Sequence, residues 1–96
     1  MNKTELIDAI SDKSGLTKKD AKLALDATLE SITEALASKK DVLIIGFGTF
    51  SSVERIARKG TIPGSGKVID IPARFAPRFK AGKLLKDSVK WKTNND

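Results

Sequence analysis

The feature that most constrains the fold is a change in the spacing of apolar residues near residue 40. From Leu6 to Leu36, apolar side chains recur every three or four residues, which is the period of a helix that packs against a core. From residue 41 onward, short runs rich in β-branched and aromatic residues take over, and such runs are typical of strands. The sequence therefore predicts an α+β fold, with a helical half followed by an antiparallel sheet.

The helical half is predicted to be an αα-hairpin over residues 1–38. Asn2 and Glu5 have the spacing of a capping box, in which each side chain bonds the other residue's backbone N–H. Gly15 can adopt the left-handed conformation that ends a helix. Thr17 then provides the cap of a second helix. The short connection between the helices leaves one apolar seam along the hairpin.

The sheet half, residues 41–80, contains a predicted long β-ribbon arm. Two strand-like runs flank the turn-rich segment "GTIPGSG", which predicts a hairpin whose arm spans about residues 55–74. Its tip is expected near Pro63-Gly64. Pro72 interrupts the returning run and cannot donate a backbone hydrogen bond, so it predicts either an edge strand or a bulge.

The end of the chain is predicted to form a short helix over residues 82–91, followed by a polar tail over residues 92–96. Lys83 and Lys86 are three residues apart and share one face of that helix. We expect residues 1–96 to form a single domain, since a chain of 96 residues has the length of one domain and contains no internal repeat.

The composition argues against an enzyme and against a bound cofactor or metal. The chain contains no cysteine and no histidine, which are common catalytic and metal-binding residues. "GFGTFS" lacks the third glycine of a dinucleotide fingerprint, and "GTIPGSGKV" lacks the glycine spacing and the Ser/Thr of a P-loop. No apolar run is long enough to span a membrane, and no secretory signal is apparent. We therefore expect a cytoplasmic protein without a membrane partner.

The distribution of charge indicates an anionic partner. The net charge is +6, but residues 1–45 carry 7 basic and 8 acidic side chains, whereas residues 46–96 carry 11 basic and 4 acidic ones. Such segregation is typical of a surface that binds nucleic acid or an anionic membrane. A solubilising surface without a specific partner is the alternative interpretation.

The predicted arm leaves too little chain for a self-sufficient core. Without it about 75 residues remain, and below roughly 70–80 residues a single core rarely supplies more than about 3–5 kcal/mol. Disulfides cannot compensate, because there is no cysteine. The sequence therefore predicts a partner that completes the core, most simply a second copy related by a two-fold axis. Two basic arms projecting from one dimer would form a clamp.

Several segments together resemble the family of the bacterial histone-like HU protein and its relative, integration host factor. They include "MNKTELIDAI", "LTKKDA", "ALDATLESITEAL", "GFGTF", "ARKG", "IPA" and "FKAGKLLKDSVK", and the similarity runs from Met1 to about Lys90. The resemblance implies an intertwined homodimer, or a heterodimer with a paralogue, associated with the nucleoid. It also implies two arms that embrace double-stranded DNA from the minor groove, each with a proline at its tip that wedges between base pairs. Pro63 falls on that position.

The resemblance assigns the expected DNA contacts to the arm and to the body. Phosphate contacts carry no sequence information, so we expect weak sequence preference and a bias toward bent, nicked or flexible DNA. The expected contacts on the arm are Arg55, Arg58, Lys59, Lys67 and Arg74, with Ile62 and Pro63 at the tip. Those on the body are Lys3, Lys80, Lys83 and Lys86.

The sequence departs from the usual family pattern at the arm tip. HU arms commonly read "RKGRNP", whereas this chain reads "RKGTIP", so Thr61 replaces an arginine and Ile62 replaces a polar residue. The strength of DNA bending is thus left open. It is also open whether Pro63 only forms the turn.

A protein that binds RNA is the rival interpretation. RNA-binding sheets usually display aromatic side chains for base stacking. Here Phe47, Phe50, Phe75 and Phe79 cluster near the expected base of the arm, where core packing is the better use. A role at a membrane surface would need a basic amphipathic helix with bulky apolar anchors, and only the last helix with Trp91 approaches that.

Overall fold

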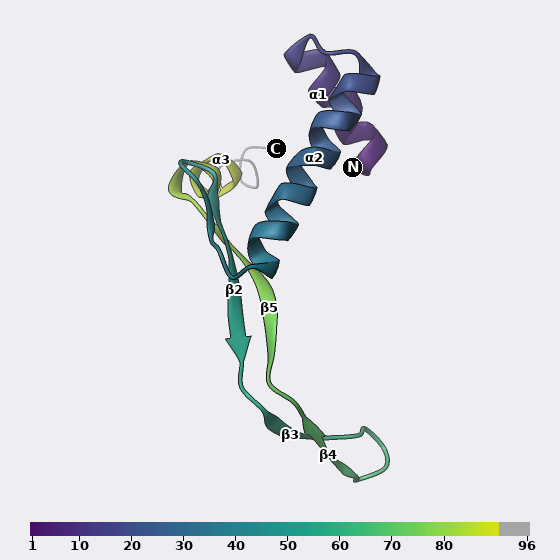
Figure 1. The fold of residues 1–96 in the computed structure, drawn as a ribbon, viewed down its shortest axis with the longest axis vertical. Helices are drawn as coiled ribbons and strands as arrows, with labels where there is room; N and C mark the ends of the chain where they lie inside the picture. Colours follow the sequence, from purple (N-terminus) through teal and green to yellow (C-terminus); the bar gives the residue numbers. More distant parts are fainter. Residues whose placement is uncertain (91–96) are drawn as a thin grey trace. The chain divides into compact units, whose positions relative to one another are not determined.

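A computed structural model describes residues 1–90 (Figure 1). The chain divides after Glu34 into two compact units. The first unit is helical, and the second contains every strand and the last helix of the described chain. The predicted α+β class is confirmed. Trp91 and the polar tail expected over residues 92–96 lie outside the described residues.

The first helix, α1 (Lys3–Ser14), begins and ends as predicted. The side chain of Asn2 accepts the backbone N–H of Glu5 at 2.8 Å, and the backbone N–H of Asn2 donates to the Glu5 carboxylate at 3.3 Å. This reciprocal capping box satisfies two donors that a helix start would otherwise leave unpaired. Gly15 ends the helix in the left-handed conformation, with φ of 79°.

The second helix, α2 (Lys18–Ala37), begins at the predicted cap. The Thr17 hydroxyl oxygen accepts the backbone N–H of Asp20 at 3.1 Å. An ion pair between Lys18 and Asp8, 3.3 Å apart, joins the start of α2 to the middle of α1. The predicted αα-hairpin therefore has local interactions at both of its helix starts.

The sheet of the second unit has three antiparallel strands in the order β1 (Val42–Ile44), β2 (Gly48–Arg55) and β5 (Arg74–Ala81). Gly48 lies where β2 passes close to β5, since a Cβ there would come within 2.6 Å of the Lys80 carbonyl oxygen. Pro77 stands within β5, which is an edge strand and therefore tolerates a residue without an N–H.

The arm continues the β2–β5 pair as a two-stranded ribbon of β3 (Arg58–Thr61) and β4 (Val68–Ile71) (Figure 1). Residues 56–57 and 72–73 separate the two ladders, two residues on each strand, so the register continues without an inserted residue. A bulge at Pro72 is therefore excluded. Pro72 instead lies in a break of the ladder, because it has no N–H to donate.

The arm tip is a turn over residues 63–65, as predicted. The Ile62 N–H donates to the carbonyl of Lys67 at 2.9 Å, and the Ser65 N–H donates to the carbonyl of Ile62 at 3.2 Å. Gly64 adopts a φ of 82°, which a residue with a side chain rarely reaches. The turn is thus closed by its own backbone bonds.

The last helix, α3 (Lys83–Lys90), begins directly after Gly82. The Gly82 N–H donates to the Phe47 carbonyl at 2.7 Å. A Cβ at residue 82 would come 3.1 Å from the backbone carbonyl carbons of Gly46 and Phe47. Glycine therefore lets the start of α3 approach the β1–β2 turn. The helix starts one residue after the predicted start at residue 82, and its predicted end at residue 91 lies outside the described residues.

One chain buries very little apolar surface. Ala21 is the one apolar residue that is fully buried between residues 1 and 90. The ring of Phe79 packs against Phe50 and Phe47, with centroids 4.7 and 5.6 Å apart, yet Phe79 stays 43% exposed. Ile45 in the β1–β2 turn is 92% exposed. A single described chain thus lacks the closed core of an ordinary domain.

Candidate nucleic-acid interface

The β2–β5 ladder has two chemically different faces, because residues paired across a ladder share a face and successive residues alternate between faces. Arg55 pairs with Arg74, and Ser51 pairs with Arg78. These pairs place basic and hydroxyl side chains on one side, with no acid among them. We call this side the cationic face, which comprises Thr49, Ser51, Val53, Arg55, Arg74, Ala76, Arg78 and Lys80.

The opposite side of the same ladder carries the ring cluster of the sheet. Phe50 pairs with Phe79 and Glu54 pairs with Phe75, so these side chains share the second face. Its only acid is Glu54. We call this side the aromatic face, which comprises Gly48, Phe50, Ser52, Glu54, Phe75, Pro77, Phe79 and Ala81.

Two arginines face each other at the end of the ladder where the arm begins. Arg55 and Arg74 are direct cross-strand partners, and both side chains are exposed. Like charges directly opposite each other destabilise a strand pair. A bound anion between them would remove this repulsion, so the pair is better suited to binding than to folding.

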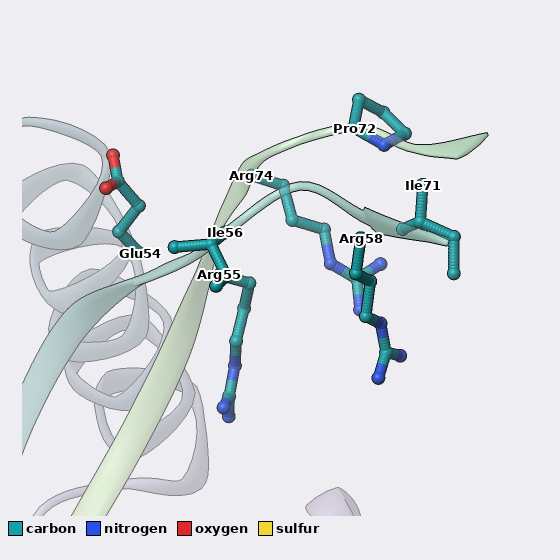
Figure 2. Close-up of a pocket in the computed structure, with 7 residues that line it drawn as sticks. All are labelled: Glu54, Arg55, Ile56, Arg58, Ile71, Pro72 and Arg74. Atoms are coloured by element: carbon teal, nitrogen blue, oxygen red, sulfur yellow. The ribbon is translucent and has the colours of Figure 1, made fainter. Parts of the chain in front are cut away.

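A third arginine joins this pair around a hollow of about 450 Å³ at the base of the arm. Figure 2 shows the side chains of Arg55, Arg74 and Arg58 extending to the same side. Glu54 also lines the hollow, but its carboxylate extends in another direction from the three arginines. Strict alternation would put Arg58 on the face opposite to Arg55, since the two are three residues apart. The unpaired residues 56–57 interrupt that alternation and allow the three guanidinium groups to gather.

The arm beyond the break carries an internal ion pair. Lys59 pairs with Asp70 in the register of β3 and β4, and their charged groups are 3.5 Å apart. Both side chains are largely exposed. Asp70 is the only acid between residues 55 and 83. Lys59 is therefore the arm cation whose charge is most directly offset within the chain.

The tip presents apolar side chains beside a cation. Ile62 is 39% exposed, and Pro63 is exposed on the turn that follows it. Lys67, also exposed, begins the return to β4. The turn therefore presents two apolar side chains close to a cation.

The predicted body residues of the second unit are Lys80 in β5 and Lys83 and Lys86 in α3, and all three are exposed. Lys80 belongs to the cationic face. The second unit thus contains all the expected contacts except Lys3.

Lys3 lies in the first unit, where its ammonium is 2.6 Å from the Asp26 carboxylate. This hydrogen bond, together with the positive charges of Lys3 and Lys22, holds the pKa of Asp26 below its usual value, although desolvation acts in the opposite direction. Within one chain, Lys3 therefore links α1 to α2 through its ion pair with Asp26.

Sequence reasoning left Arg78 out of the expected contacts. Arg78 lies on the cationic face between Arg74 and Lys80 and opposite Ser51. The signal was present in the sequence, because residues 74, 78 and 80 have the even spacing that puts side chains on one face of a strand. It becomes decisive only once the continuous β2–β5 register is known.

The fold and the acid-free cationic face define a small basic protein of the nucleic-acid-binding class. The family model for "Bacterial DNA-binding protein" matches residues 1–90. DNA-binding protein HU from Geobacillus stearothermophilus and that from Staphylococcus aureus are each 57% identical over 90 residues, which is 94% of this chain and all of each relative. The chain therefore belongs to the bacterial DNA-binding protein family, in its HU group.

Solved structures agree with this assignment. The chain is similar to the protein in an Anabaena HU–DNA cocrystal structure, with a TM-score of 0.88, 47% identity, and coverage of 93% of this chain and 97% of that one. HU from Thermotoga maritima, solved as a mutant, gives a TM-score of 0.68 at 45% identity over 93% and 99% of the two chains. The helical hairpin, the arm and the final helix therefore form an HU fold.

Proposed function

We propose that the protein is an architectural, histone-like DNA-binding protein that holds duplex DNA along the cationic face and the arm, and bends it at the arm tip. Family membership supports DNA binding and argues against an enzyme. The observation that carries the proposal is the acid-free cationic face, which leads through the three clustered arginines to the apolar turn at Ile62 and Pro63.

The positive side chains supply attachment rather than sequence recognition. Arg55, Arg74 and Arg78 present guanidinium groups that can bond phosphate oxygens in pairs. Contacts with phosphate position a protein on DNA without reading its sequence, and the minor groove offers only a degenerate code. The protein therefore binds many sequences with similar affinity.

The tip supplies the bend. Ile62 and Pro63 insert between base pairs, which costs a few kcal/mol of unstacking. The cost is offset when the bent duplex contacts more of the cationic face. DNA that is already bent, nicked or flexible requires less unstacking and binds more tightly. Because Thr61 carries no charge, the tip contacts are fewer and more apolar than in arms with an arginine there.

The functional unit is a homodimer whose two arms form the clamp. The exposed apolar residues of one chain, such as Ile45, Leu84 and Phe47, are covered by the second copy. Folding and dimerisation are then one event, so the melting temperature rises with protein concentration. A helical monomer at micromolar concentration in light scattering would contradict this. If the second chain were a paralogue instead of a second copy, the assembly would be a heterodimer.

The site of action that follows is the bacterial nucleoid in the cytoplasm. Weak sequence preference suits a protein that binds chromosomal DNA at many positions. Among residues 1–90, no helix is long and apolar enough to cross a membrane.

The salt dependence of binding tests the proposed function. If a dimer neutralises roughly 6–10 phosphates, its affinity for duplex DNA falls by about 10³–10⁵ between 50 and 200 mM salt. Structured RNA competes poorly in the same assay. A flat salt dependence, or RNA that competes as well as DNA, would reject the proposal.

A further inference from the structure

Lys39 has an unusual backbone conformation. Its φ is 61°, and among residues 1–90 it is the one residue other than glycine with a positive φ. The left-handed region is disfavoured for L-residues, because the side chain crowds the following carbonyl. A lysine held there, rather than a glycine, indicates a compensating interaction of its side chain.

The conformation closes the end of α2. The Lys40 N–H donates to the carbonyl of Ala35 at 2.8 Å, and the Lys39 N–H donates to the carbonyl of Leu36 at 3.1 Å. This pair of bonds is a Schellman motif, in which the left-handed position is usually glycine. The motif explains the backbone at residue 39, but it does not explain the choice of a lysine.

The side chain of Lys39 supplies the explanation. Its ammonium nitrogen lies 4.0 Å from the centroid of the Phe75 ring, well within the range of a cation–π interaction. Phe75 pairs with Glu54, next to the Arg55–Arg74 pair that ends the ladder. The contact therefore joins the end of α2 to the base of the arm.

A second bond ties the same turn to the same face of the sheet. The Ser52 hydroxyl donates to the Leu36 carbonyl at 2.6 Å. That carbonyl also accepts the Lys39 N–H, so one oxygen links the helix end, the strained turn and the sheet. Ser52 and Phe75 both belong to the aromatic face.

We propose that Lys39 is a positioning residue, which fixes the base of the arm through the ring of Phe75. The inference rests on the proposed function, since the arm matters because it embraces DNA. Lys39 itself binds no phosphate, because its ammonium lies over the aromatic face, opposite to Arg55 and Arg74. A firmly held base lets each arm close on DNA with less loss of conformational freedom.

Amide hydrogen exchange of the free protein tests the contact without DNA. In Lys39→Gly, exchange at residues 53–55 and 74–76 rises several-fold, while the melting temperature does not fall, because glycine suits the left-handed turn. Lys39→Arg retains the cation and exchanges like the wild type. Phe75→Leu raises exchange at the same residues as Lys39→Gly does. The double variant exchanges no faster there than either single variant, because both substitutions remove the same contact. Exchange unchanged in Lys39→Gly would overturn the proposal.

DNA titrations separate positioning from phosphate binding. Lys39→Gly loses several-fold in affinity at fixed salt, but the slope of log affinity against log salt stays that of the wild type. A slope reduced by about one contact per arm would make Lys39 a phosphate contact and overturn the proposal. If the wild type itself showed no salt-dependent DNA binding, the proposed function would fail, and the exchange data would still decide the role of Lys39.

Discussion

The two faces of the β2–β5 ladder use the same backbone for opposite purposes. On the aromatic face, Phe79 lies against Phe50, and Phe75 lies under the Lys39 ammonium. On the cationic face, two arginines stand directly opposite each other in an arrangement that opposes folding. One face gains stability from its neighbours within the chain, whereas the other requires an anion from outside.

The difference shows how a small chain separates folding from binding. Strand alternation sends residues 50, 52 and 54 to one side and residues 49, 51 and 53 to the other. A substitution in the ring cluster of Phe47, Phe50 and Phe79 should therefore change stability with little effect on intrinsic binding, and a substitution on the cationic face should do the reverse. Phe75 at the base of the arm is the exception, because its contact with Lys39 positions the arm. Each prediction below tests that separation.

The largest effect is expected from Phe79→Ala on the aromatic face. The substitution removes the ring that contacts both Phe47 and Phe50. We expect the free energy of unfolding to fall by about 2–3 kcal/mol, below the usual range for a fully buried phenylalanine because this ring is partly exposed. Thermal and urea unfolding followed by circular dichroism would measure it. Arg78→Ala is the matched control on the opposite face, and equal destabilisation by both variants would break the comparison.

Next in size is the effect of Arg55→Ala on the cationic face. Loss of a charge-assisted contact should lower affinity for duplex DNA by about tenfold or more at low salt and reduce the salt slope by about one per arm. The melting temperature should stay the same or rise slightly, because the repulsion with Arg74 disappears. Titration at several salt concentrations, paired with a melting curve, would check both signs. A marked loss of stability would contradict the division between faces.

The smallest effect is expected on the arm, where Asp70→Asn should strengthen DNA binding by about two- to fivefold. The change releases Lys59 from its exposed ion pair and removes the arm's only acid. Glu54→Gln is the matched control, since it also removes one negative charge but lies on the aromatic face. Equal gains from the two variants would mean that only net charge matters and that the position of a charge does not.

Local sequence signals predicted the elements and most of the candidate site. Asn2, Glu5 and Gly15 fixed the limits of α1, because caps depend on residues only a few positions apart. The turn formers after Thr61 likewise located the arm tip.

The features of the site that could not be predicted from the sequence depend on pairing between distant residues. The gathering of Arg58 with Arg55 and Arg74 requires the break at residues 56–57 and 72–73, which is a property of two strands together. The role proposed for Lys39 could not be predicted from the sequence either, because its side chain contacts a ring more than thirty positions away. The expected dimer and the individual DNA contacts remain predictions.

The central claim is that the cationic side chains attach the DNA and the apolar tip bends it. Pro63→Ala, compared on a straight duplex and on a duplex kinked by a nick, tests this claim most directly. Energy transfer between the duplex ends gives the bend angle, and titration of the same duplexes gives the affinity. We predict a smaller bend and a clear loss of affinity on the straight duplex, with little loss on the nicked one, where unstacking is already largely complete. Equal losses on both duplexes with an unchanged bend angle would contradict the account and leave Pro63 as a turn residue only.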